Sequence, residues 1–299
     1  MTKHRKFTAK GQLSPYLACS CNMAALVVAS HNILNGQNLR RLLRVYTELR
    51  AAERLHALCI QEAVPHAARR VAATLGRRYG VGEHSGAPRL AIVYDRARLR
   101  LRRIGIVDLP RLAAVPWWQR VYTSAVPEPK HALIGCFAVR GGFRKRPRRL
   151  VLANFHLDAA GDNRHRAGQI RALATALWPT YADGPLVACG DTNAFSLLRT
   201  EAEGLLQNML GPLARCHRAR DVHAAAPRDT HFFARAHEPK LGQRIAVALG
   251  RFGIDAPRRY DVIVAALRCI GFGTVDTPDS DHNLVWARLS HRRFHGKRH

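Results

Sequence analysis

Residues 185–193 read PLVACGDTN, so a short apolar run is followed directly by Asp191, Thr192 and Asn193. An apolar run of this length that ends in turn-forming residues is typical of a buried strand. Polar side chains that follow such a strand lie at the edge of a sheet, where proteins commonly build their sites. The stretch therefore predicts a strand that presents a carboxylate and an amide at its end.

The same arrangement recurs along the chain. Asn32 follows ALVVASH (25–31), Glu62 follows ALCIQ (57–61), His156 follows LVLANF (150–155), Asp261 opens DVIVAAL (261–267), and Asp281 and His282 precede NLVWARL (283–289). Each placement alone has an ordinary explanation, because Asn and Asp start turns and cap strands, and a histidine can belong to the core. Six such placements in one chain favour a shared site.

Strand and helix patterns alternate through most of the sequence, which is typical of an α/β protein. The helical spacing of apolar residues predicts helices within 39–58, from Pro65 to about Gly76, and over 164–177 and 195–210. Strands are predicted at 24–32, 57–60, 90–94, 132–139, 150–156, 186–190, 260–267 and 283–289, and RARLRLRR at 96–103 predicts a half-buried strand with an arginine face. We expect one domain over 21–290, between a basic N-terminal extension (1–20) and a basic tail (291–299).

Composition excludes disorder of the whole chain. The 299 residues are 47% hydrophobic and 23% charged, which supplies enough apolar material for a core. No apolar run reaches the roughly 18 to 20 residues of a membrane-spanning helix. The formal net charge is +27, and seven lysines leave 41 arginines. Phosphate-bearing substrates, nucleic acid and an anionic membrane surface would all be attracted by this field, whereas genomic base composition is the plain alternative.

The seven cysteines form no even framework, and Cys59, Cys136, Cys189 and Cys269 lie in apolar, strand-like runs. This pattern favours a reducing compartment, and we expect a cytoplasmic protein. Lysines and arginines before the apolar stretch 17–29 resemble a signal peptide, but cleavage near Ala29 would remove most of the strand that presents Asn32. A cleaved leader is therefore disfavoured, while an organellar presequence stays open.

Taken in order, the strand-end stretches SHNILNG, IQE, NFHLD, GDTN, YDVIV and SDH resemble the endonuclease/exonuclease/phosphatase superfamily of DNase I-like hydrolases, over about residues 25–290. The resemblance implies an α/β (α+β) fold, a four-layer αββα sandwich of two mostly antiparallel sheets with the site at one end between them. It also implies hydrolysis of phosphoester bonds with a divalent cation, Mg²⁺ or alternatively Mn²⁺. Carboxylates suit such a hard cation.

The resemblance also implies roles for individual residues. Glu62 matches the principal metal ligand, with Asn32 and Asp281 as further or water-mediated ligands. His282 matches the base that activates water, and Asp261 matches the carboxylate that orients this histidine. Asp191 would align or deprotonate the nucleophile, while Asn193 and His156 would donate hydrogen bonds to the phosphate. Arg166 and Gln169 match an RxxQ pattern that we interpret as structural support.

One departure concerns Leu34, which stands where several DNA-repair members carry an acid, so that one carboxylate on the metal side is missing. QEAV also lacks the Lys that often follows QE in abasic-site enzymes. Both features weaken an abasic-site endonuclease assignment and leave the number of metal ions open.

Two basic segments are candidates for contact with a polyanion. The loop 140–149 contains Arg144 and Arg146, and the apparent insertion 238–259 contains Arg244, Arg251, Arg258 and Arg259. We expect a monomeric nuclease acting on DNA or RNA. A phospholipid, sphingomyelin or inositol-phosphate phosphoesterase is the alternative, and a non-catalytic polyanion-binding protein is the third interpretation. Trp117 and Trp118 are the one candidate for an exposed aromatic contact with lipid, against packing in the core or stacking on a base.

Overall fold

The computed structural model describes residues 25–115, 128–140, 148–180, 184–194, 199–232 and 259–293. These residues form two six-stranded sheets. The first has the order β11-β12-β1-β2-β4-β3, and the second has the order β5-β6-β7-β8-β10-β9. Both are mixed, because β1 pairs in parallel with β2 and β7 in parallel with β8, while the other pairings are antiparallel.

The strands of the first sheet come from both ends of the described chain. They are β1 (Ala25–Asn32), β2 (Ala57–Gln61), β3 (Tyr79–Gly82), β4 (Leu90–Asp95), β11 (Leu267–Val275) and β12 (Leu284–Arg293). The second sheet is built from the middle of the chain. Its strands are β5 (Leu99–Leu109), β6 (Lys130–Val139), β7 (Arg148–His156), β8 (Leu186–Asp191), β9 (Arg220–Asp221) and β10 (Asp261–Ala265).

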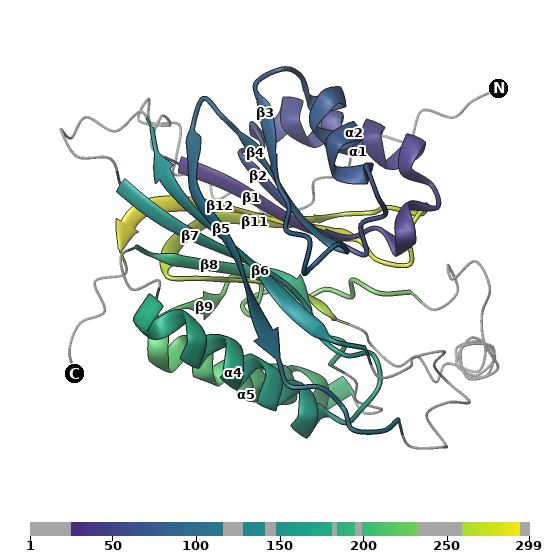
Figure 1. The fold of residues 1–299 in the computed structure, drawn as a ribbon, viewed down its shortest axis with the longest axis vertical. Coiled ribbons are helices and arrows are strands. Elements are labelled where there is room, and N and C mark those ends of the chain that lie inside the picture. Colours follow the sequence, from purple (N-terminus) through teal and green to yellow (C-terminus); the bar gives the residue numbers. More distant parts are fainter. Residues whose placement is uncertain are drawn as a thin grey trace.

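Helices cover the outer faces of the two sheets (Figure 1). The first sheet carries α1 (Leu39–Glu53) and α2 (Ala67–Leu75), and the second carries α4 (Asn163–Thr180) and α5 (Arg199–His217). A 3₁₀ turn, η2 (Leu34–Gly36), joins β1 to α1. The four-layer αββα sandwich predicted from the sequence is therefore confirmed. Among the helices of the described residues, none is long and apolar enough to span a membrane.

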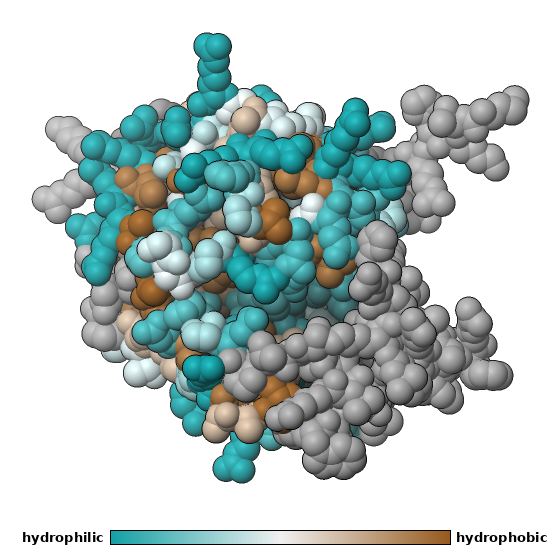
Figure 2. Space-filling view, turned by 45° about the vertical axis from the view of Figure 1, so that its right-hand side comes forward, coloured by the Kyte–Doolittle hydropathy of each residue, from teal (hydrophilic) through white to brown (hydrophobic). Residues whose placement is uncertain are grey.

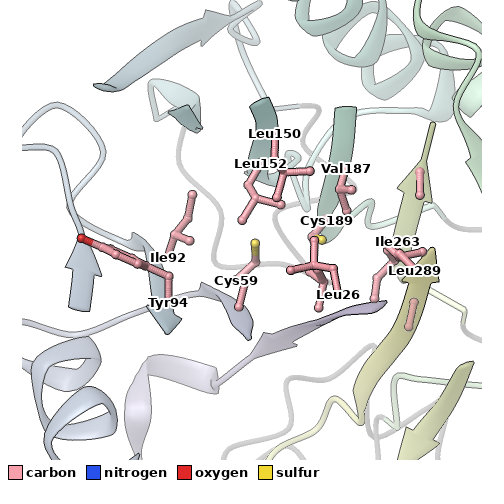
Figure 3. Packing of buried hydrophobic residues seen from close by; sticks show 14 of the residues in the cluster. Leu26, Cys59, Ile92, Tyr94, Leu150, Leu152, Val187, Cys189, Ile263 and Leu289 are labelled. Atoms are coloured by element: carbon pink, nitrogen blue, oxygen red, sulfur yellow. The ribbon is translucent and has the colours of Figure 1, made fainter. Parts of the chain in front are cut away.

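Three hydrophobic clusters hold the four layers together, because alternate residues of a strand point to opposite faces. In β2, Cys59 faces the opposite sheet, whereas Leu58 and Ile60 face α1 and α2. In β8, Cys189 faces the opposite sheet and Ala188 faces α4 and α5. Figure 3 shows the cluster between the sheets, where Cys59 and Cys189 approach from opposite sides. The strands are thus buried on both faces, which explains their continuous apolar runs.

Two expected elements differ in the structure. The segment 260–267 was expected to be one strand, but the chain turns at Ala266, so that β10 belongs to the second sheet and β11 to the first. The expected arginine-faced strand 96–103 begins only at Leu99, because a turn follows β4 and a β-bulge lies between Leu101 and Arg103. Arg100 and Arg102 are exposed, as the alternating pattern predicts.

Two further boundaries of the observed elements differ from those expected from the sequence. The first helix ends at Glu53, where Arg54 adopts a left-handed conformation, so residues 54–56 lead into β2 instead of extending the helix. The C-terminal strand β12 continues to Arg293, three residues past the domain boundary expected from the sequence. The domain limits themselves stay a prediction.

Candidate active site

The predicted site residues lie where the two sheets meet at one edge. Parallel pairing brings the carboxyl ends of β1 and β2, and of β7 and β8, to that edge, and antiparallel pairing brings the amino ends of β10 and β12 there. Within the second sheet, Asp191 lies directly opposite both His156 and Asp261. The six strand ends noted in the sequence thus supply one constellation.

His282 lies at the centre of this constellation. Its Nδ1 is 2.8 Å from Asp261 Oδ2, and its Nε2 is 3.6 Å from Asp191 Oδ2 and 3.9 Å from Asp281 Oδ1. Burial lowers the pKa of His282, but the three carboxylates outweigh it and hold that pKa well above the usual value. The carboxylates therefore stabilise the imidazolium form of this side chain.

The pKa values of the two aspartates that flank His282 are shifted in opposite directions. Burial raises the pKa of Asp261 to about 6, against the opposing effect of His282. For Asp191, burial also favours the neutral form, but the histidines His282 and His156 and hydrogen bonds from Asn193 and Asn32 hold its pKa below the usual value. Asp191 is thus an anion that accepts hydrogen bonds from both sheets.

Asn32 joins the carboxylates of the two sheets. Its Nδ2 donates to Glu62 Oε1 at 3.1 Å and to Asp191 Oδ2 at 3.0 Å, while its Oδ1 accepts from the backbone N–H of Leu34 at 3.1 Å. The hydroxyl of Ser280 donates to the backbone carbonyl of Asn32 at 2.9 Å and ties the SDH stretch to β1. In this arrangement Asn32 positions Glu62 and Asp191, and its role as a metal ligand stays a prediction.

The residues predicted to hold a metal fit a divalent cation by their chemistry. Glu62 is part-buried and Asp281 is buried, and Asp281 Oδ1 makes no hydrogen bond. A buried carboxylate oxygen without a donor is costly unless a cation balances it. Burial raises the pKa of Asp281, but His282 and His231 hold it at about 2, so this carboxylate is ionised. Oxygen donors of this type are those that Mg²⁺ prefers.

His156 and Asn193 border the same space. His156 Nε2 lies 3.6 Å from Asp191 Oδ2 and 3.9 Å from Glu62 Oε1, and burial lowers its pKa. Asn193 donates its backbone N–H to Asp191 Oδ1 at 2.8 Å and its side-chain amide to the carbonyl of Leu157 at 3.0 Å. Both residues are only part-buried, so a phosphate group can reach them.

The backbone at the site is strained at two of these residues. Glu62 has a φ of 53° and Asn193 a φ of 47°, both in the left-handed region that non-glycine residues rarely adopt. Gly190, the first residue of GDTN, has a different reason to be glycine. A Cβ at this position would meet the carbonyl oxygen of Phe155 at 2.1 Å. The close approach of β7 to β8 that places Asp191 therefore requires glycine here.

Sequence reasoning missed two residues at the site. His231, on the segment before the undescribed residues 233–258, places its Nε2 3.5 Å from Asp281 Oδ2 and stacks on Tyr260 with ring centroids 4.8 Å apart. Arg89, which is half exposed, places its Nη2 3.8 Å from Glu62 Oε2 and bonds Asn35. Neither residue follows an apolar strand. Arg89 directly precedes the predicted strand 90–94, and this position beside a strand is the one sequence feature that could have pointed to it.

The structure corrects the expectation for one basic residue. Arg259 was grouped with the polyanion-binding stretch 238–259, but it is buried and bonds Glu203 through two hydrogen bonds, at 2.7 and 2.8 Å, and Asp221 through one at 2.6 Å. Arg259 therefore has a structural role: its ion pairs join α5 and β9 to the residues just before β10. The substrate-binding predictions for Arg144, Arg146, Arg244 and Arg251, and the tryptophans Trp117 and Trp118, lie outside the described residues.

Arg166 and Gln169 on α4 have the supporting role predicted for them. Arg166 donates to the backbone carbonyls of Asp158 and Ala159, both at 2.8 Å. Gln169 accepts from the N–H of Asp158 at 3.1 Å and donates to the carbonyl of Pro110 at 2.9 Å. These bonds fix the loop that follows His156.

No family model matches the sequence, and no curated protein matches it. Solved structures match the fold. An endonuclease/exonuclease/phosphatase from Bacteroides vulgatus is 17% identical, with a TM-score of 0.63 over 89% of this chain and 99% of the other. TDP2 of D. rerio, complexed with single-strand DNA product, is 14% identical, with a TM-score of 0.61 over 89% and 99%.

A mannosyl-6-phosphatase from Bacteroides thetaiotaomicron is 14% identical, with a TM-score of 0.58 over 88% of this chain and 99% of the other. The likeness extends over nearly the whole length of each of these proteins, and it concerns the arrangement of strands and helices described above. The chain therefore has the DNase I-like αββα fold of the endonuclease/exonuclease/phosphatase superfamily.

Proposed function

We propose that this chain is a divalent-metal-dependent phosphodiesterase that hydrolyses phosphoester bonds, with nucleic acid as its substrate. The observation that carries the proposal is the Asp261–His282–Asp191 constellation, in which Nδ1 of the imidazole bonds one carboxylate at 2.8 Å and Nε2 faces the other at 3.6 Å. Carboxylate and imidazole groups so placed can orient a water molecule and accept its proton.

His282 is the base in this proposal, and it acts in the neutral form, which a cation bound to the neighbouring carboxylates would favour by offsetting their charge. The hydrogen bond to Asp261 fixes the orientation of the imidazole and leaves Nε2 directed toward Asp191. A water molecule held by Asp191 would lie within reach of Nε2, and the surrounding carboxylates stabilise the imidazolium that forms when His282 takes the proton. Asp191 in turn is held in place by Asn32 and by the backbone of Asn193.

Glu62 and Asp281, with Asn32 close by, would hold the cation. A divalent cation supplies Lewis-acid stabilisation of charge on the phosphoryl oxygens and the leaving group. His156 and Asn193 lie beside Asp191, where they would donate hydrogen bonds to the phosphate. Each such donor is typically worth about 3 kcal/mol in the transition state.

Charge favours a polyanionic substrate. The net charge of +27 attracts phosphates at long range, and a nucleic acid gains affinity for each phosphate that Lys or Arg neutralises. On the face shown in Figure 2, hydrophilic residues cover most of the described surface and hydrophobic ones stand in small separate groups. Such a face suits a charged polymer better than the interior of a lipid layer. TDP2, which shares the fold, was solved with single-strand DNA.

A phosphoesterase acting on sugar phosphates is the second candidate, because a mannosyl-6-phosphatase has the same fold at a similar TM-score. The two candidates share the site and differ in what lies around it. A sugar-phosphate enzyme needs no extended basic surface, so its affinity for substrate would depend weakly on salt.

The test compares wild type with His282→Ala on end-labelled single- and double-stranded DNA and RNA, and on a panel of sugar and lipid phosphates. We expect Mg²⁺-dependent cleavage of a nucleic acid that is lost in EDTA and in the variant. The product ladder then gives endo or exo action and polarity. Hydrolysis of sugar or lipid phosphates alone would overturn the nuclease assignment, and no hydrolysis by folded protein would overturn the enzyme assignment.

A further inference from the structure

Three buried side chains at the site form a cluster that differs in chemistry from the carboxylates predicted to hold Mg²⁺. His231, Asp281 and His282 each offer one ligand atom, and these atoms all lie within 4.8 Å of one another. The shortest separations that involve Asp281 are 3.5 Å from Oδ2 to His231 Nε2 and 3.9 Å from Oδ1 to His282 Nε2.

Bonds of about 2.0 to 2.2 Å from zinc to nitrogen and oxygen put neighbouring ligand atoms of a tetrahedral site roughly 3.3 to 3.5 Å apart. The separation of Asp281 Oδ2 from His231 Nε2 has that length, whereas the cluster as a whole extends to 4.8 Å. Binding of one ion therefore requires the side chains to close by up to roughly 1.5 Å. Asp281 Oδ1 is buried without a hydrogen bond, so a cation is needed beside this carboxylate whichever ion binds there.

We propose that His231, Asp281 and His282 form a zinc-binding site that shares Asp281 with the proposed magnesium site and blocks catalysis when it is filled. The ligand set decides the metal, because two imidazoles and one carboxylate are typical of zinc, whereas Mg²⁺ prefers oxygen ligands and retains water. Asp281 is among the ligands proposed for both ions, so Zn²⁺ and Mg²⁺ compete for its carboxylate.

The surroundings of His282 match those of a zinc-bound histidine. Its Nδ1 bonds Asp261 Oδ2 at 2.8 Å, which leaves Nε2 to meet the cluster. A carboxylate bonded to the far nitrogen is the usual support of a histidine that binds zinc through the other nitrogen. His231 is also held in place, by stacking on Tyr260 and by an edge contact with His282 at 4.7 Å between ring centroids.

The functional consequence rests on the role proposed above for His282. The lone pair of Nε2 that would accept a proton from water is the one that would bind zinc. With zinc bound, His282 can neither take that proton nor give it up. Trace zinc would thus keep the protein inactive in the presence of Mg²⁺, and a chelator selective for zinc would restore activity.

The test measures zinc binding directly and without substrate. Titration calorimetry and the visible spectrum of the Co²⁺-substituted protein are recorded for wild type, His231→Phe, His231→Gln and Glu62→Gln. The Phe variant keeps an aromatic ring on Tyr260 and removes the ligand nitrogen, and the Gln variant serves if that ring does not fit. Because the chain contains 16 histidines and seven cysteines, the readout is the difference in bound zinc between wild type and variant and not the total zinc bound.

We expect the His231 variants to bind one zinc ion fewer, or to bind it at least tenfold more weakly, while Glu62→Gln retains it. Anomalous diffraction at the zinc edge of wild-type crystals should place the ion between the three side chains. Equal zinc binding by wild type and both His231 variants, or an ion located elsewhere, overturns the site. Zinc bound here without inhibition of the Mg²⁺-dependent activity overturns the blocking role alone. Absence of phosphoesterase activity in zinc-free buffer counts against the proposed function and leaves the binding result standing.

Discussion

Asp191 and Asp261 lie directly opposite each other on β8 and β10, and the imidazole of His282 contacts both of them, at 3.6 Å through Nε2 and at 2.8 Å through Nδ1. His282 comes from the side of the other sheet, two residues before β12 begins at Leu284. The pairing of two strands in one sheet thus sets the position of a side chain carried by the other.

Replacing Asp261 by Asn should lower kcat by roughly 10²- to 10⁴-fold with little change in KM, because the orientation and the charge of the imidazole both depend on that carboxylate. Steady-state kinetics with the preferred substrate, together with a thermal melt, measure this. Asp108→Asn is the matched control, since Asp108 bonds His131 at the same 2.8 Å on an exposed part of β5. A loss of only a few-fold in Asp261→Asn would remove His282 from the chemistry.

Gly190→Ala should destabilise the fold by about 3 kcal/mol, at the upper end of the usual cost of overpacking, because the new Cβ would meet the backbone of Phe155 at 2.1 Å. Gly168→Ala on α4 is the control, as its Cβ has no neighbour within 4 Å and alanine favours a helix by up to about 1 kcal/mol. Urea unfolding gives both values. Equal stability of the two variants would contradict the tight β7–β8 contact.

Arg259→Met should cost about 3 to 5 kcal/mol of unfolding free energy, because it leaves the buried carboxylate of Asp221 and the partner Glu203 without their cation. The exposed pair of Arg44 and Glu48 at 2.9 Å provides the comparison, and Arg44→Met should change little. If nucleic-acid affinity fell in Arg259→Met while the melting temperature stayed constant, Arg259 would belong to the substrate surface after all.

Stability should fall in acid partly through His223. Burial lowers the pKa of this histidine to about 4, with Asp221 raising it and Arg259 lowering it further. The native state therefore holds His223 neutral while the unfolded chain protonates it below pH 6.5. Above pH 6.5 His223 is neutral in both states and does not lower the free energy of unfolding. As the pH falls toward 4, its protonation in the unfolded chain lowers the free energy of unfolding by up to about 3 kcal/mol.

Chemical unfolding of wild type and His223→Gln at several pH values between 4 and 8 measures this contribution. The variant should show the shallower dependence over that range. His31, whose burial lowers its pKa to about 3, acts in the same direction in both proteins and cancels in the comparison. Parallel curves would mean that His223 is not held neutral.

Charge reversal in the two basic segments tests the substrate surface. Arg244→Glu with Arg251→Glu, or Arg144→Glu with Arg146→Glu, should weaken binding to nucleic acid. The plot of log K against log salt should also become flatter, by about 0.9 for each phosphate that the replaced arginines neutralise in wild type. Fluorescence anisotropy with a catalytically inactive His282→Ala background gives the slopes. Unchanged affinity and slope in both double variants would assign these arginines to solvent.

Apolar runs were sufficient to predict most of the strands and the polar residues at their ends, because buried strands carry continuous apolar stretches. The four-layer arrangement came from the resemblance to the endonuclease/exonuclease/phosphatase superfamily. The sequence was not sufficient for residues that are placed by the fold alone. His231 is preceded by Asp229 and Thr230 and follows no apolar run. Long-range contacts such as the bridge between His231 and His282 bring it to the site. The partners of Arg259 lie 56 residues away on α5 and 38 residues away on β9, so sequence alone suggested solvent or substrate for that guanidinium.

Local conformation was equally hidden. Nothing in IQEAV indicates that Glu62, directly after β2, adopts a positive φ. Strand β11 was missed because glycines interrupt its apolar pattern, and its separation from β10 depends on a single turn at Ala266.

The place of β12 between β1 and β11 has a consequence for biosynthesis. Strand β1 pairs with β2 on one side and with β12 on the other, and β1 emerges from the ribosome more than 250 residues before β12. Until β12 has been made, β1 keeps one row of backbone groups open, and neither Asp281 nor His282 exists. If the proposed function holds, a nascent chain of this protein cannot cut a phosphoester while it is being translated, and the chain needs protection from pairing with other chains for that whole interval.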